Sequence, residues 1–217
     1  MKVILIVATG RSASTTLQRI INTIKKSNIN GENWGAVNNL LECYHNIKKT
    51  KLESPHKADG TFYNSDECQK RKIKQAFVNT FDFEIVVDNI KKTILSILNI
   101  SKDNTVYGFK EIRYFNKLYL IEQFLELFPN TKIICHIDEN LDRQKNSAWH
   151  KKNPEASKKH LTLYNEQLIN FVNSNENCYL STRDNLFNLE EMKNLFIFIE
   201  EDLDEEEYNF ILNDNVE

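Results

Sequence analysis

The stretch "KVILIVATGRSASTTLQRII" (residues 2–21) contains the pattern that decides the fold. Residues Lys2–Ala8 form a nearly continuous apolar run rich in β-branched side chains, which is typical of a strand buried on both faces of a sheet. A polar stretch, Thr9–Thr16, comes next. Apolar residues then recur at i, i+3, i+4 and i+7 from Leu17 and predict a helix over 14–27. The order of buried strand, polar loop and helix indicates an α/β protein.

The rest of the chain continues this alternation. Three further strands are predicted, at Val106–Phe109, 131–137 and 177–182. Helical patterns occur at 34–49, 66–80, 84–99, 117–128, 140–152, 161–174 and once or twice after Leu189, with a turn at 28–33 and a surface loop at 50–66. Strands that alternate with helices predict a central parallel sheet with helices on both faces, in a single domain over 1–217.

Length and charge limit the classes of function. A chain of 217 residues can bury about 70% of its unfolded surface and needs no disulfides for stability. The net charge of −3 argues against a general nucleic-acid-binding protein. The acidic run "EEDLDEEEY" (residues 200–208) is read as a solvated helix face or first helical turn, with an interaction tail as the alternative.

The cysteines and the start of the chain indicate a compartment. Cys43, Cys68, Cys135 and Cys178 are far apart, without CxxC or metal-ligand spacing, so we expect free thiols in a reducing environment. The first apolar run is only as long as a strand and lacks a cleavage-site pattern, unlike a signal peptide or membrane anchor. We therefore expect a cytoplasmic protein with no membrane or nucleic-acid partner and no metal site.

The loop after the first strand has the composition of an anion site. The free N–H groups at a helix N-terminus and the helix dipole attract an anion, and glycine permits close backbone approach. The candidate ligands are the backbone or side chains of Gly10, Arg11, Ser12, Ala13, Ser14, Thr15 and Thr16. The loop lacks the Gly-Lys pair of the Walker A pattern, which argues against ATP or GTP hydrolysis. The alternative is a strand-to-helix turn that caps itself with Ser and Thr.

This loop, "TGRSASTTLQRII", resembles the 5′-phosphosulfate loop of sulfotransferases that use 3′-phosphoadenosine-5′-phosphosulfate (PAPS), with Ala13 at a usual glycine position. The stretches "NGENWGAVNNLLECY", "YGFKEIRY", "FLELFPNTKIICHIDENLDR" and the tail from "YLSTRDNLF" are similar to further segments of carbohydrate-type members, in the family's order. The resemblance implies a P-loop NTPase-like α/β fold. It also implies PAPS as donor, PAP as product, no metal, and transfer of a sulfuryl group to a hydroxyl on a small-molecule or glycan acceptor, for which we expect a carbohydrate.

The segment similar to the family's 3′-phosphate site departs from the pattern. Asp138 stands where the family has arginine, and Asn140 where it has proline. A carboxylate repels a phosphate, so Arg143, with Lys145, Lys151 and Lys152 as alternatives, is the expected substitute. Ser147 matches the family's serine, with Asn146 as the alternative alignment, and Trp149 is a candidate for adenine stacking or for the core.

The resemblance and the chemistry together assign catalytic roles. Sulfuryl transfer to a hydroxyl needs a base and fixed positive charge. Glu32 matches the family's glutamate base, and the alternative for it is a carboxylate that caps the following helix. His45 and His136 are weaker candidates for the base. A histidine within a strand, such as His136, is more often a core residue. Arg11 and Lys110 are assigned to charge stabilisation, because Lys110 lies at the carboxyl end of a predicted strand, where ligands bind in open α/β sheets.

The acceptor is expected to contact Asn33, Trp34, Glu111 and Arg113, and a salt-bridged turn is the alternative for the last two. Two other functions remain open. A small-molecule P-loop kinase would need Mg²⁺ and ATP, and a catalytically degenerate family member would bind PAPS or PAP without transfer.

Overall fold

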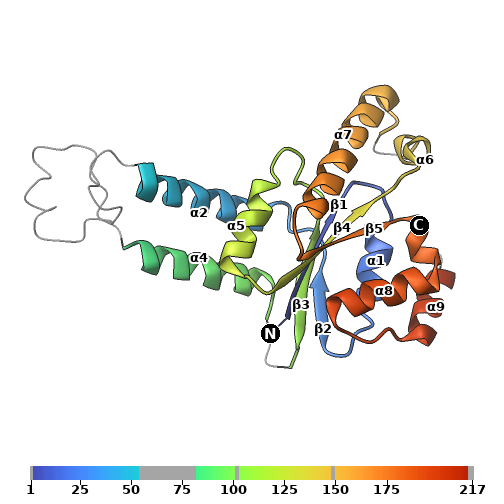
Figure 1. Cartoon of the computed structure of the whole chain (residues 1–217), viewed down its shortest axis with the longest axis horizontal. Helices are drawn as coiled ribbons and strands as arrows, with labels where there is room; N and C mark the ends of the chain where they lie inside the picture. The colour runs from blue at the N-terminus through green and yellow to red at the C-terminus, as the bar shows by residue number, and fades with distance from the viewer. Residues whose placement is uncertain (1, 54–81, 101–102, 148–149, 215–217) are drawn as a thin grey trace, which may run out of the picture. The chain divides into compact units, whose positions relative to one another are not determined.

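The computed structural model describes residues 2–53, 82–100, 103–147 and 150–214, and their contacts divide them into two compact units. One unit consists of Met1–Gly35 with Ile100–Glu217 and contains the whole sheet (Figure 1). The other, Ala36–Asn99, is inserted between two strands. The expectation of a single domain over 1–217 stays a prediction.

The sheet has five parallel strands in the order β2-β3-β1-β4-β5. Their bounds are β1 Lys2–Ala8, β2 Ser27–Asn30, β3 Val106–Glu111, β4 Thr131–Ile137 and β5 Cys178–Thr182. The central strand β1 is buried from Val3 onward, as its apolar run predicted. Its end pairs Val7 with Glu111 and Ala8 with His136, so the carboxyl ends of β3, β1 and β4 meet at one edge of the sheet. The predicted α/β fold is confirmed.

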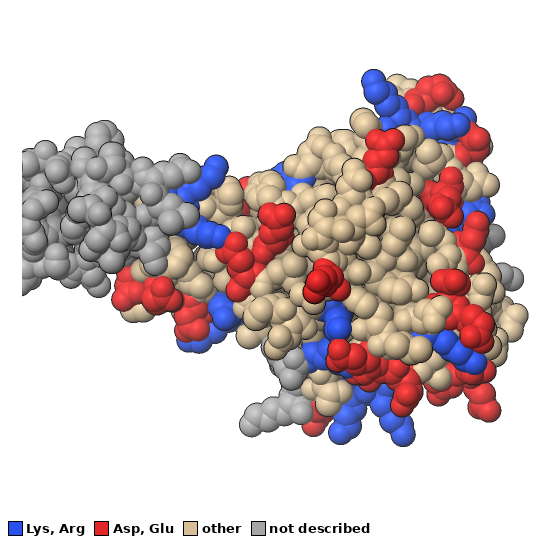
Figure 2. Space-filling model, in the orientation of Figure 1, with Lys and Arg blue, Asp and Glu red and all other residues tan. Residues whose placement is uncertain are grey.

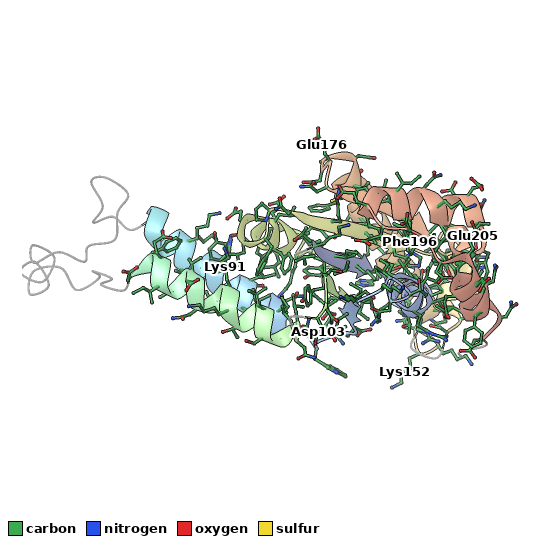
Figure 3. The ribbon with its side chains drawn as sticks, turned by 90° about the horizontal axis from the view of Figure 1, so that it is seen from below. Lys91, Asp103, Lys152, Glu176, Phe196 and Glu205 are labelled. Carbon is green, nitrogen blue, oxygen red and sulfur yellow. The ribbon has the colours of Figure 1, made fainter. Side chains whose placement is uncertain are left out.

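Helices cover both faces of this sheet (Figure 1). The helices α1 (Ser14–Ile21), α8 (Leu189–Ile199) and α9 (Glu205–Asn213) share a core with the even-numbered residues of β1. Phe196 of α8, labelled in Figure 3, is 1% exposed within that core. On the opposite face, α5 (Tyr119–Leu127) places Phe124 against Phe109 of β3, with 5.9 Å between ring centroids, and α7 (Pro154–Asn173) contacts β4 and β5. The short helix α6 (Leu141–Lys145) follows β4, and a 3₁₀ turn, η1 (Asp184–Phe187), follows β5.

The inserted unit consists of two helices that contact each other, α2 (Ala36–Glu53) and α4 (Phe83–Ile97). Asp82 caps α4, because its Oδ1 accepts hydrogen bonds from the N–H groups of Glu84 and Ile85 at 3.0 and 3.2 Å. Both helices were predicted. The predicted loop does not begin at Thr50, since α2 continues through that position; the rest of the loop, the predicted helix at 66–80 and Cys68 lie outside the described residues.

The strand β2 is a correction to the predicted helix over 14–27 and turn over 28–33. Helix α1 ends at Ile21, and the side chain of Asn22 then pairs with Ile29: Nδ2 donates to the carbonyl at 2.9 Å and Oδ1 accepts from the N–H at 2.8 Å. Because β2 is an edge strand with only Ile29 buried, its sequence "SNIN" lacks an apolar pattern.

The acidic run near the C-terminus begins a helix, as one of its predicted interpretations stated. Asp204 Oδ1 accepts from the N–H groups of Glu206 and Glu207, both at 3.1 Å, and caps α9. In Figure 2, acidic and basic side chains are interspersed over the surface that α8 and α9 form. Acidic residues in a first helical turn stabilise the helix through its dipole.

Candidate functional site

The predicted anion loop joins β1 to α1 at the carboxyl edge of the sheet. Thr9 N–H donates to the carbonyl of His136 at 3.2 Å and extends the β1–β4 pairing by one residue. The chain then reverses through two left-handed residues, Arg11 (φ 67°) and Ala13 (φ 66°, ψ 24°). Ala13 would fit the family's glycine position without strain if its backbone angles were right-handed helical. The left-handed angles instead explain why glycine is the usual residue there.

The loop leaves backbone donors available. The carbonyl of Ala13 accepts from the N–H groups of Thr16 and Leu17 at 3.0 and 3.2 Å. The N–H groups of residues 10–15 have no hydrogen-bond acceptor among the described residues. Helix α1 has no side-chain cap, so the predicted alternative of a self-capping turn is wrong. These donors, at the positive end of a helix dipole, form an anion cradle.

Ser12 contributes differently from its prediction. The residue is fully buried, and its hydroxyl donates to the carbonyl of Thr9 at 2.8 Å. Its hydroxyl is therefore engaged within the loop, and only its backbone N–H remains available for a ligand.

Two buried side chains hold the loop in place. Gln144 of α6 donates through Nε2 to Thr9 Oγ1 at 3.0 Å and to the carbonyl of Gly10 at 2.6 Å. His136 of β4 contacts the carbonyl of Ser12 through Nε2 at 2.8 Å and Ser181 Oγ through Nδ1 at 3.0 Å. Because a carbonyl only accepts, Nε2 carries the proton.

Burial lowers the pKa of His136 from 6.5 to about 4, so the ring is neutral at pH 7. His136 is therefore a buried loop-holding residue, as its core-histidine interpretation predicted, and it does not line the cavity described next.

A cavity of about 560 Å³ opens beside the loop. It brings together three residues predicted from separate parts of the sequence: Arg11 of the loop, Glu32 after β2, and Lys110 near the end of β3. Its lining consists of Gly10, Arg11, Ala13, Ser14, Thr15, Thr16, Arg19, Glu32, Lys110, Ile112, Arg183, Phe187, Ile211, Leu212 and Asp214. The loop residues in this lining supply backbone N–H donors, and the Arg, Lys, Glu and Asp side chains supply charges. Phe187 and the α9 residues Ile211 and Leu212 form an apolar wall.

The predicted base and the predicted cation contact each other. Lys110 Nζ lies 2.7 Å from Glu32 Oε1, and Arg113 Nη1 lies 3.1 Å from Glu32 Oε2. Both carboxylate oxygens are bound by cations, so the helix-capping alternative for Glu32 does not describe this side chain. The side chain of Lys110 is 8% exposed and that of Glu32 is 22% exposed, which shields this pair from solvent.

Glu111 is a correction. We predicted that it faces the acceptor beside Lys110, but it is fully buried and does not line the cavity. The physical reason is the alternation of a strand, which sends adjacent side chains to opposite faces. Lys110 points to the α1 face, and Glu111 points to the face of Phe109 and α5.

The other predicted acceptor residues surround Glu32. Trp34 is 84% exposed and has a left-handed backbone with φ 56°. Arg113 Cζ lies 4.9 Å from the centre of its ring, in cation–π contact. Asn33 lies between Glu32 and Trp34 in the chain. Contact of Asn33, Trp34 and Arg113 with an acceptor stays a prediction, as does any role for the half-buried His45.

The unusual Asp138 is neutralised within the protein. It is fully buried, and Arg143 binds it through both oxygens, with Nε–Oδ2 at 3.0 Å and Nη2–Oδ1 at 2.7 Å. Arg143 also contacts Asp184 at 3.2 Å and does not line the cavity. Lys145 is paired with Asp142 and Glu155. The predicted 3′-phosphate role of Arg143 stays a prediction, and its charge is already shared between two carboxylates.

The remaining residues of that segment differ in their burial and contacts. Ser147 Oγ is buried without a hydrogen-bond partner among the described residues and does not line the cavity, so its contact with the cofactor stays a prediction. Lys151 and Lys152 are exposed. Trp149 lies outside the described residues.

Sequence reasoning missed Arg183. Its N–H donates to the carbonyl of Ile137 at 2.8 Å, its Nη1 lies 3.8 Å from Asp138 Oδ2, and its buried Nε has no hydrogen-bond partner among the described residues. It follows the predicted strand at 177–182, so the argument that selected Lys110 at the end of a strand also selects Arg183. Arg19 and Asp214, an ion pair at 2.5 Å in the cavity wall, join α1 to the end of α9 and have no local sequence signal.

Comparison with known proteins gives the family. The model of the sulfotransferase family matches residues 4–187, most of the chain. The chain belongs to the sulfotransferase family. Its structure is similar to the sulfotransferase domain from the Synechococcus PCC 7002 olefin synthase, with a TM-score of 0.58 and 13% identity over 95% of this chain and 76% of that domain.

The family fold recurs in a second solved structure. The sulfotransferase domain from the curacin biosynthetic pathway gives a TM-score of 0.53 and 14% identity, over 94% of this chain and 75% of that domain. No curated protein sequence matches this chain. The described residues include no cluster of His, Cys, Asp and Glu able to hold a metal ion. None of the helices within the described ranges is long and apolar enough to cross a membrane.

Proposed function

We propose that the protein transfers a sulfuryl group from PAPS to a hydroxyl, with a carbohydrate as the expected acceptor. The observation that carries the proposal is the composition of one cavity: unpaired loop N–H groups, Arg11 and Lys110, with the Glu32 carboxylate beside them. Membership of the sulfotransferase family supports the same reaction.

The residues fit such a donor. The backbone donors of residues 10–15 and the Arg11 guanidinium suit a phosphosulfate group, and charge-assisted hydrogen bonds of this kind are the strong ones. Arg183, which also lines the cavity, adds a further cation that suits a second phosphate. Phe187, which is 62% exposed, offers a ring face to adenine. A volume of about 560 Å³ lies in the range of cofactor pockets.

The chain's own residues would act as follows. Bound PAPS supplies an activated sulfuryl group and leaves as PAP. Glu32 accepts the proton of the attacking hydroxyl. Lys110, 2.7 Å from Glu32, and Arg11 stabilise negative charge that develops during transfer. Because an anion in the cavity competes with Glu32 for Lys110, donor binding releases one carboxylate oxygen for the base role.

A transfer assay tests the proposal. Sulfate-labelled PAPS is incubated with a panel of glycans and small hydroxyl compounds, and product formation is followed for the wild type, Glu32→Gln and the matched control Glu122→Gln, an exposed carboxylate of α5. We expect Glu32→Gln to lower turnover by about 100-fold or more, with PAP affinity retained and the control unchanged. Normal turnover in Glu32→Gln would remove this residue from the base role.

The same samples separate the alternatives. Thermal stabilisation by ATP with Mg²⁺ but not by PAP would replace the proposal with a P-loop kinase. A binding protein without transfer is favoured by the buried Asp138 at the family's arginine position. It would bind PAP and sulfate no acceptor in the panel.

A further inference from the structure

We propose that Glu111 is a positioning residue for the base Glu32. The proposal rests on the proposed function, because it assigns Glu111 to the same transfer reaction. Glu111 follows Lys110 in β3 but lies on the opposite face of the sheet, fully buried and outside the cavity. A buried carboxylate is costly unless it is fully paired. Its partners therefore indicate its role.

Within the described part of the chain, the hydrogen bonds to Glu111 come from segments beside the candidate base. Its Oε2 accepts from the N–H of Gly35 at 3.2 Å. Its Oε1 accepts from the N–H of Ile112 at 2.9 Å and from Arg113 Nη1 at 2.5 Å. The carboxylate thus joins the end of β3 to the turn after β2, in which Glu32 lies.

Two adjacent residues of β3 hold this turn at its two ends. Lys110, on one face of the sheet, binds the Glu32 side chain, and Glu111, on the other face, binds the Gly35 backbone. Between them the chain passes through Trp34 (φ 56°) and Gly35 (φ 78°), two consecutive left-handed residues. A left-handed tryptophan is strained and persists only where surrounding contacts fix the backbone. Glu111 supplies such a contact from a rigid, buried strand.

Arg113 provides a second route from Glu111 to the base. The same Nη1 atom lies 2.5 Å from Glu111 Oε1 and 3.1 Å from Glu32 Oε2. Glu111 therefore orients the Arg113 guanidinium that contacts Glu32 Oε2. No residue of the anion loop is among the partners of Glu111, so its loss should affect turnover and leave donor binding intact.

The test combines kinetics with amide hydrogen exchange in Glu111→Gln, in which the side chain keeps its shape but loses its charge and one acceptor. The matched control is again Glu122→Gln. We expect PAP affinity within twofold of the wild type and turnover at saturating PAPS and acceptor lowered at least tenfold. We also expect exchange of a peptide covering residues 31–36 to be accelerated severalfold. The control should match the wild type in all three readouts.

Each other result is decisive. Unchanged turnover, or unchanged exchange at residues 31–36, in Glu111→Gln would overturn the proposal. A fall in PAP affinity parallel to the fall in turnover would assign Glu111 to general stability instead. If Glu111→Gln fails to fold, the wild type still tests the contact by NMR, because an unprotected Gly35 amide would contradict it. If the wild type transfers no sulfate, the proposed function fails, while the exchange measurement still decides whether Glu111 holds the turn.

Discussion

The left-handed conformation of Ala13 leads to a stability prediction that differs from the one for an ordinary helical alanine. For an L-residue this conformation costs about 1–2 kcal/mol, and Ala13→Gly removes that cost. Against this gain, glycine adds about 0.4–1 kcal/mol of unfolded-state entropy. The Ala13 methyl also packs at the edge of the core, and its loss costs about half of a buried methyl's ~0.8 kcal/mol. The midpoints of these three ranges predict that Ala13→Gly raises the free energy of unfolding by about 0.5 kcal/mol.

The matched control is Ala156→Gly, at an exposed right-handed position of α7. There the same substitution relieves no strain and should lower the free energy of unfolding by about 1 kcal/mol. Urea unfolding at 25 °C therefore should place the two variants on opposite sides of the wild type, about 1.5 kcal/mol apart. If Ala13→Gly destabilises the protein as much as Ala156→Gly does, Ala13 does not have the left-handed conformation described above.

Three further predictions follow from buried or charged residues. The lowered pKa of His136 means that, from about pH 6.5 down to about pH 4, the unfolded chain binds a proton that the folded protein does not. Acidification across that window should thus lower the free energy of unfolding by up to about 3 kcal/mol. Urea unfolding at several pH values checks this, and a pH dependence in His136→Asn equal to that of the wild type would contradict it. Asp214→Asn removes a carboxylate from the anion cavity and releases Arg19. Calorimetry at low salt should therefore show PAP binding two- to fivefold tighter, a gain of about 0.5–1 kcal/mol in binding free energy. Weaker binding would contradict the assignment of this cavity to PAP. A Cβ at Gly108 would lie 1.8 Å from the carbonyl oxygen of Ile4. Gly108→Ala should therefore lower the free energy of unfolding by at least about 3 kcal/mol in urea. An unfolding midpoint equal to that of the wild type would refute the close approach of β1 and β3.

The sequence was sufficient for the features that depend on local periodicity. The strands β1 and β4 are buried apolar runs, and their patterns alone predict a parallel sheet with the loop at its edge. The Gly10–Thr16 loop was recognisable because an anion site at a helix N-terminus needs only neighbouring residues. Lys110 was found by a positional rule, the carboxyl end of a strand, which required no contact information.

The sequence failed where a role depends on tertiary contacts. The edge strand β2 is polar, and its pairing with Asn22 comes from a side chain that the helical pattern assigned to α1. Glu111 was misassigned because adjacency in sequence was read as adjacency in space, although strand side chains alternate. The bidentate pairing of Asp138 with Arg143 gives an apparent defect a structural role, and it could not be inferred from either residue alone.

The central claim, that the loop after β1 holds the phosphosulfate end of PAPS, is tested most directly by calorimetric titration of PAP into the wild type, Arg11→Ala and the control Lys25→Ala. Lys25 is exposed and outside the cavity lining. Because a hydrogen bond to a charged group contributes about 1.5–3 kcal/mol, Arg11→Ala should weaken PAP binding at least about tenfold with an unchanged unfolding midpoint, and Lys25→Ala should bind as the wild type does. Equal PAP affinity in Arg11→Ala and the wild type would contradict the account.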